Sequence, residues 1–146
     1  MCVGNTGTNN ISNIKTYETF GVTNDHIDQV KIHIGQLLNV EFELHESDYL
    51  GMYYLARLPD SMNIKILQNF ADGDWQEEDH MDCPLLIEIN RSSSAIFEKL
   101  YSSSLPYLKH LYRTEIESKQ YARKFKIQNG KLILLSEHKI KNPYNS

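Results

Sequence analysis

Six carboxylates and the only tryptophan of this chain fall within residues 71–82, and no lysine or arginine lies among them. The acids are Asp72, Asp74, Glu77, Glu78, Asp79 and Asp82, and the tryptophan is Trp75. Such a segment repels nucleic acid and attracts basic surfaces, and tryptophan is favoured at the centres of protein interfaces. We therefore expect these seven residues to bind a partner, with the carboxylates imitating a phosphate backbone.

Charge is also divided unevenly along the chain. Residues 1–98 hold 5 Lys and Arg against 16 Asp and Glu, a net charge of −11, whereas residues 99–146 hold 10 against 3, a net charge of +7. The two parts together give the overall charge of −4. The basic part includes Lys119, Arg123, Lys124, Lys126, Lys131, Lys139 and Lys141.

A nucleic-acid-binding module is one alternative that this basic part suggests. Tyr121 and Phe125 lie between the cations and could stack on bases. No RNA-binding signature is present, however, and the net charge is negative. A solvated strand face is the preferred interpretation, so direct binding of nucleic acid is not expected.

A small metal-dependent enzyme is the other alternative, with His80 and the nearby carboxylates as its groups. The acidic segment does not fit the calcium-loop pattern, and no Cys and His spacing fits zinc. Cys83 follows six acids that would raise its pKa and oppose the thiolate, which favours a structural role. No nucleophile-elbow, dinucleotide or P-loop motif occurs. We expect no catalytic residue, no metal site and no cofactor.

Length and composition predict one domain over residues 1–146, with residues 1–12 and 142–146 flexible. The two cysteines, Cys2 and Cys83, do not make a disulfide framework. No apolar run reaches 18 residues, and the first 20 residues lack the apolar core of a signal peptide. These observations predict a cytoplasmic protein.

The first half of the chain predicts a helix followed by a three-stranded meander. Residues 24–38 have apolar side chains at helical spacing, with Thr23 or Asn24 as the cap. Alternating residues predict strands at 40–44 and 63–70, and a Tyr- and Leu-rich stretch predicts a strand at 52–58.

The second half predicts a central strand at residues 84–89 and a helix over 94–103, capped by one of the serines 92–94. Residues 105–116 are ambiguous, because their apolar residues lie at helical spacing. Strands at 121–127 and 131–138 flank Asn129-Gly130, a strong hairpin signal. This order predicts an α+β fold with a mostly antiparallel sheet and helices packed on one face.

Residues 49–100 also resemble a known class of protein. The pattern is strand 53–56, the strand 64–70 ending in Gln68-Asn69-Phe70, the acidic stretch through residues 78–80, and the apolar strand 84–87. It is similar to the bacterial immunity proteins of contact-dependent growth inhibition and related polymorphic toxin systems.

The resemblance implies a non-catalytic cytoplasmic inhibitor that binds a cognate toxin domain, the C-terminal domain of a large secreted protein. The toxin expected from the acidic surface is a nuclease with a basic cleft. Tyr53 and Glu88 are additional, weaker contact candidates, and no membrane partner is expected.

Overall fold

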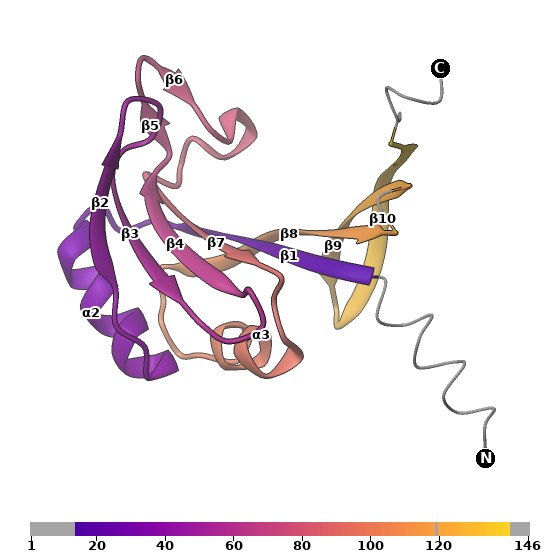
Figure 1. Ribbon diagram of the computed structural model, residues 1–146, viewed down its shortest axis with the longest axis horizontal. Helices are drawn as coiled ribbons and strands as arrows, with labels where there is room; N and C mark the ends of the chain where they lie inside the picture. Colours follow the sequence, from indigo (N-terminus) through magenta and orange to yellow (C-terminus); the bar gives the residue numbers. More distant parts are fainter. Residues whose placement is uncertain (1–13, 119, 141–146) are drawn as a thin grey trace.

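One antiparallel sheet of eight strands forms the framework of the computed structural model, which describes residues 14–118 and 120–140 (Figure 1). Its strand order is β10-β9-β8-β1-β7-β4-β3-β2. The strands are β1 Ile14–Val22, β2 Glu43–Ser47, β3 Gly51–Arg57, β4 Asn63–Gln68, β7 Leu85–Asn90, β8 Leu108–Glu117, β9 Tyr121–Gln128 and β10 Lys131–Lys139. Together with two α-helices, this sheet confirms the predicted α+β class.

Both helices, α2 (Ile27–Leu38) and α3 (Ser94–Tyr101), lie against the same face of the sheet (Figure 1). The core beneath them is built from every second residue of the central strands, because successive side chains of a strand point to opposite faces. It holds Phe20, Val22, Ile64, Ile66, Leu85, Ile87 and Ile89, together with Val30, Ile34, Leu38, Ile96, Phe97 and Leu100 from the helices. This face is called the helix-covered face below.

The opposite face, called the uncovered face below, has a smaller apolar cluster of its own. Leu67, Leu86 and Leu111 are buried there, and Leu50, Tyr53 and Tyr112 pack against them. Leu86 lies between Leu85 and Ile87 of the main core, and Leu67 follows Ile66 of that core. The acidic segment between β4 and β7 reaches this cluster, where the Tyr112 hydroxyl donates a hydrogen bond to Glu77.

Several predicted elements are confirmed. The meander appears as β2, β3 and β4, the apolar run is the central strand β7, and Ser93 caps α3 by accepting a hydrogen bond from the Ile96 amide at 3.2 Å. Asn129 and Gly130 join β9 to β10 with φ values of 53° and 76°, as a type I′ turn requires. Within the described residues, no helix is long and apolar enough to cross a membrane.

Two strands differ from the sequence-based expectation. Strand β1 was not predicted at all, although it lies near the middle of the sheet between β8 and β7. The ambiguous stretch 105–116 is largely strand β8, and its helical spacing arises because a bulge brings Leu111 to the uncovered face while Leu108 packs against the helix-covered core.

Several boundaries also differ from the prediction, since α3 ends at Tyr101 and not at residue 103, and β4 ends at Gln68 and not at residue 70. Helix α2 begins at Ile27 with His26 as its cap, and the Asn24 side chain accepts a hydrogen bond from the His26 amide instead of capping the helix. Strand β2 begins at Glu43, because residues 40–42 are irregular and use Val40 and Phe42 to pack on the core. The predicted flexible segments 1–12 and 142–146 lie outside the described residues.

Gly21 of β1 allows the acidic segment to approach the uncovered face closely. A Cβ atom at this position would lie 2.5 Å from the Cys83 sulfur and 3.1 Å from a Leu111 methyl carbon. Both neighbours are buried, so neither can move aside without disturbing the packing. Only glycine therefore fits between β1 and Cys83.

We expect Gly21→Ala to lower the free energy of unfolding by about 1–3 kcal/mol, the usual cost of overpacking a core. Urea denaturation measures this change. In a Cys83→Ala background, which removes the sulfur, the same substitution should cost less. An equal cost in both backgrounds would show that the contact with Cys83 is not the cause.

Candidate functional site: an acidic lobe

Residues 69–83, which we call the acidic lobe, form an ordered projection from the sheet. The lobe contains a short hairpin, β5 (Phe70–Ala71) and β6 (Asp74–Trp75), followed by the 3₁₀ helix η1 (Glu78–His80). Asp72 and Gly73 make the hairpin turn with φ values of 53° and 77°. An Asp-Gly turn flanked by aromatic residues is a hairpin signal, whereas Asp72 was expected only to contribute a negative charge.

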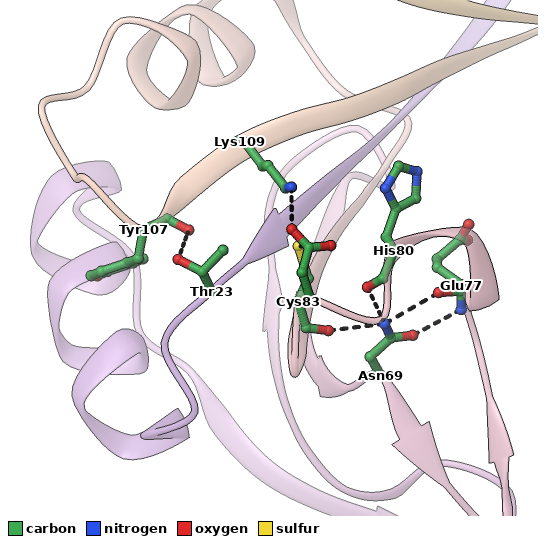
Figure 2. Close-up of polar contacts among 8 residues, drawn as sticks. Thr23, Asn69, Glu77, His80, Cys83, Tyr107 and Lys109 are labelled. Atoms are coloured by element: carbon green, nitrogen blue, oxygen red, sulfur yellow. Dashed lines mark hydrogen bonds and ion pairs between the residues drawn. The ribbon is translucent and has the colours of Figure 1, made fainter.

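The buried side chain of Asn69 holds the lobe together (Figure 2). Its Nδ2 donates to the carbonyl oxygens of Cys83 at 2.9 Å, His80 at 3.0 Å and Glu77 at 3.3 Å. Its Oδ1 accepts a hydrogen bond from the Glu77 amide at 2.8 Å. One amide group thus satisfies backbone atoms from both ends of the 3₁₀ helix and from the return to β7. On sequence grounds Asn69 stood out only within the Gln68-Asn69-Phe70 pattern of the resemblance, and nothing in that pattern indicates its role as an anchor.

The lobe is also tied to strand β8 at its far end. Asp82 Oδ2 accepts a hydrogen bond from Lys109 Nζ at 2.5 Å, and this ion pair lowers the pKa of the Asp82 carboxyl (Figure 2). Burial raises the pKa of the neighbouring Cys83 thiol, so Cys83 stays protonated at neutral pH. Cys83 is a packing residue, as its sequence context predicted.

Glu77 makes a third connection to the sheet. The Tyr112 hydroxyl of β8 donates to Glu77 Oε2 at 2.5 Å. Burial, and then this hydrogen bond, raise the pKa of Tyr112 far above its ordinary value. Glu77 and Asp82 therefore help to fasten the lobe, which was not foreseen when all six acids were assigned to partner contact.

The remaining four carboxylates, those of Asp72, Asp74, Glu78 and Asp79, are exposed. Among residues 14–118 and 120–140, none of them has a lysine, arginine or histidine within ion-pair distance. Asp74 makes only a local hydrogen bond, from the Trp75 amide to its Oδ1 at 2.9 Å. Over the described residues, the structure thus presents four negative charges without ion-pair partners on one anchored projection.

An aromatic pair accompanies these charges. The rings of Phe70 and Trp75 meet edge to face with centroids 5.1 Å apart. Trp75 is half-buried, whereas Phe70 is 51% exposed. The predicted anchor Trp75 is therefore partly used to hold the hairpin, and Phe70 offers more apolar surface to a partner.

A hollow of about 240 Å³ opens beside the lobe on the uncovered face. It is lined by residues of β7, β1 and β8, among them Glu88, Asn90, Tyr17 and Tyr112. Burial, against the opposing effect of Lys65, raises the pKa of the Glu88 carboxyl, and nearby Glu77 raises it further. Of the two weaker candidates, Glu88 thus faces a hollow, whereas Tyr53 packs in the small cluster and stacks on His45.

A second group of ionisable side chains lies away from the lobe, on the helix-covered face. Glu18 of β1 is 1% exposed and accepts hydrogen bonds from His110 Nε2 at 2.8 Å and from Arg113 Nε at 2.6 Å. Both donors belong to β8, so the cluster ties these neighbouring strands together. Within the described residues, no three His, Cys, Asp or Glu side chains are grouped so as to hold a metal ion.

Comparison with known proteins does not assign the chain to a family. No family model, no curated protein and no solved structure matches it.

We expect Asn69→Ala to loosen the lobe while the sheet remains folded. Each buried carbonyl or amide left without a partner costs about 1–3 kcal/mol, so amide hydrogen exchange should accelerate in residues 70–83 before it accelerates in β4 or β7. The matched control is Asn90→Ala, which removes a side-chain hydrogen bond to Asn63 at 3.0 Å but touches no lobe residue. Equal exchange in the two variants would contradict the anchoring role of Asn69.

We expect Glu88→Gln to stabilise the protein at neutral pH. When folding raises the pKa of a carboxyl, the folded protein loses stability as pH rises from the unfolded pKa toward the folded pKa. That penalty persists at any pH above both values. The variant should match the wild type near pH 4 and exceed it near pH 7 in urea denaturation. Glu98→Gln, on the exposed surface of α3, is the control. Lower stability of Glu88→Gln at pH 7 would mean that attraction to Lys65 outweighs burial.

Proposed function

We propose that this protein is a toxin-neutralising immunity protein whose acidic lobe binds a basic surface of its toxin. The observation that carries the proposal is the set of four exposed carboxylates, without an ion-pair partner among the described residues, on a lobe held by the buried Asn69 amide. The resemblance of residues 49–100 to immunity proteins supports the same function. On this proposal the protein acts in the cytoplasm, where it meets the toxin domain.

Preorganisation of the lobe favours tight binding. A flexible acidic loop would lose conformational freedom when it bound, whereas a lobe already held by hydrogen bonds loses little. The exposed Phe70 and the half-buried Trp75 add apolar contact area next to the charges. Aromatic anchors of this kind contribute much of the binding free energy in protein interfaces.

The charges set the rate of encounter and the choice of partner. A nuclease groove that holds a phosphate backbone is lined with lysine and arginine, and the carboxylates of Asp72, Asp74, Glu78 and Asp79 provide the opposite sign. Electrostatic steering of this kind raises association rate constants to about 10⁸–10⁹ M⁻¹s⁻¹ at low salt, against roughly 10⁵–10⁶ M⁻¹s⁻¹ without it. A toxin domain bound through its groove cannot bind its nucleic-acid substrate.

The partner is identified by affinity capture of the tagged full chain from its source cells in moderate salt, followed by mass spectrometry. We expect recovery of the C-terminal domain of a large secreted protein with a basic surface. Inhibition of that domain's activity by the purified chain then tests neutralisation directly. Capture of such a domain without inhibition would contradict the proposal.

We expect the quadruple variant Asp72→Asn, Asp74→Asn, Glu78→Gln, Asp79→Asn to associate with the toxin at least about tenfold more slowly at low salt. Its association rate should also depend less on salt concentration, because fewer charges are being screened. Stopped-flow fluorescence measures both quantities.

The control changes net charge by the same amount elsewhere, at the exposed Glu41, Glu46, Asp48 and Asp60. Neutralising these four residues should leave most of the rate unchanged. If both quadruple variants slow association equally, the overall charge of the chain is responsible and the lobe is not the binding surface.

A further inference from the structure

The uncovered face of the sheet bears opposite charges at two separate places. The acidic lobe is one of them. The other is the β9–β10 hairpin, residues Tyr121–Lys139, which we call the basic arm. Figure 1 shows the lobe, marked by β5 and β6, and the arm, marked by β9 and β10, projecting from different parts of the molecule.

Three lysines of the basic arm point to the uncovered face. The Lys124 ammonium lies 3.9 Å from the ring centre of Tyr112, which packs in the small cluster on that face. Lys126 lies on the same face because it is two residues further along β9. Lys131 of β10 does so as well, because it pairs with Gln128, the next residue in the same alternation.

Within the described part of one copy, these lysines and the lobe carboxylates form no ion pair with one another, although Lys124 packs on Tyr112, whose hydroxyl donates to Glu77. The ion pairs of the basic arm join Arg123 to Glu117 and to Glu137, and that of the lobe joins Asp82 to Lys109. Over the described part of the chain, Lys124, Lys126 and Lys131 have no carboxylate within ion-pair distance. Over the described residues, the lobe therefore offers carboxylates and the arm offers lysines that are free to pair with charges of a partner.

Apolar side chains are exposed at both places too. The lobe exposes Phe70, and the arm exposes Ile133 (41%), which lies on the same face as Lys131 because it pairs with Lys126. Isolated surface ion pairs contribute little to association, but exposed apolar groups beside several complementary charges can form an interface with an apolar centre and a polar rim.

We propose that two copies of this protein associate face to face, each seating its acidic lobe on the basic arm of the other. A second copy is the occupant that charge complementarity favours, because the chain itself carries both signs on one face. A single two-fold axis then creates the lobe-to-arm contact twice, so the assembly closes as a dimer. The basic arm would repel a basic toxin. The toxin therefore competes with the second copy for the lobe but not for the arm.

The dimer does not depend on the proposed toxin binding, but it would regulate it. Both lobes are covered in the dimer, so a toxin must displace the partner copy before it reaches the carboxylates. The free protein would thereby shield its acidic and apolar lobe from other basic surfaces until the toxin is present.

Sedimentation velocity of the full chain, freed of nucleic acid, tests the association. We expect a dimer in about 10 mM salt, where the Debye length is about 30 Å, and a monomer in about 1 M salt, where it is about 3 Å. A monomer under both conditions would overturn the proposal. A dimer that persists in high salt would also overturn it, and would point instead to pairing through the exposed apolar edge strand β10.

Charge reversal tests which surfaces meet. One variant reverses the charge of the lobe (Asp74→Lys, Glu78→Lys, Asp79→Lys). The other reverses the charge of the arm (Lys124→Glu, Lys126→Glu, Lys131→Glu). Each alone should be monomeric in low salt, because its lobe and arm then carry the same sign. Mixed in equal amounts, the two should form a heterodimer, because both lobe-to-arm contacts again join opposite charges.

The control variant Glu41→Lys, Glu46→Lys, Asp48→Lys changes the net charge as much as the lobe variant and should remain a dimer. Circular dichroism and thermal unfolding show whether each variant is folded. If a triple variant does not fold, the single substitutions Glu78→Lys and Lys126→Glu test the same pairing, each weakening the dimer and the mixture restoring it. Failure of the folded variants to associate when mixed would overturn the lobe-to-arm contact, as would binding of added DNA or RNA by the arm in place of the second copy.

Discussion

The hydrogen bonds of the Asn69 side-chain amide are the interaction on which the acidic lobe, the proposed binding surface, depends. Strands β4 and β7 are hydrogen-bonded neighbours in the middle of the sheet, yet the chain between them carries six acids and cannot fold back on itself through an apolar core. The Asn69 amide resolves this conflict by donating to three carbonyl oxygens and accepting from one amide. Because the polar backbone atoms of the lobe are satisfied in this way, the carboxylates of Asp72, Asp74, Glu78 and Asp79 are left facing water.

The sheet supports the lobe at a close contact that is possible because Gly21 has no side chain. Gly21 leaves room for Cys83, and the Leu67, Leu86 and Leu111 cluster fills the space beside it. Two of the acids, Glu77 and Asp82, are fastened to Tyr112 and Lys109 of strand β8. The lobe therefore divides its acids between two roles, since two fix its position and four remain available for a partner.

The separation of charge along the chain becomes a separation in space. Acidic residues project from the β4–β7 connection, and lysines lie along the last hairpin, on the same face of the sheet. An arrangement of this kind costs some stability through repulsion within each patch, and that cost is consistent with surfaces kept for association. If both proposed complexes form, the same four carboxylates bind lysines of a second copy in the free protein and cations of the toxin in the complex.

Local patterns in the sequence determined a large part of the structure. Alternating residues marked β4, a Tyr- and Leu-rich stretch marked β3 and a compact apolar run marked β7. Serines 92–94 marked the start of α3, and Asn129-Gly130 marked the last hairpin, because in each case the preference arises from neighbours along the chain. The acidic segment was also identified as a surface feature, because six carboxylates without cations cannot be buried.

Only the tertiary structure decided which of these residues act together. Strand β1 was missed because its buried Glu18 breaks the apolar pattern, and that carboxylate is compensated by His110 and Arg113, more than 90 residues later in the chain. The roles of Asn69, Gly21 and Tyr112 were likewise unreadable, since each depends on a partner from another element. The sequence determined that an acidic surface exists, whereas long-range packing decided which of its acids are held by the sheet and which face solvent.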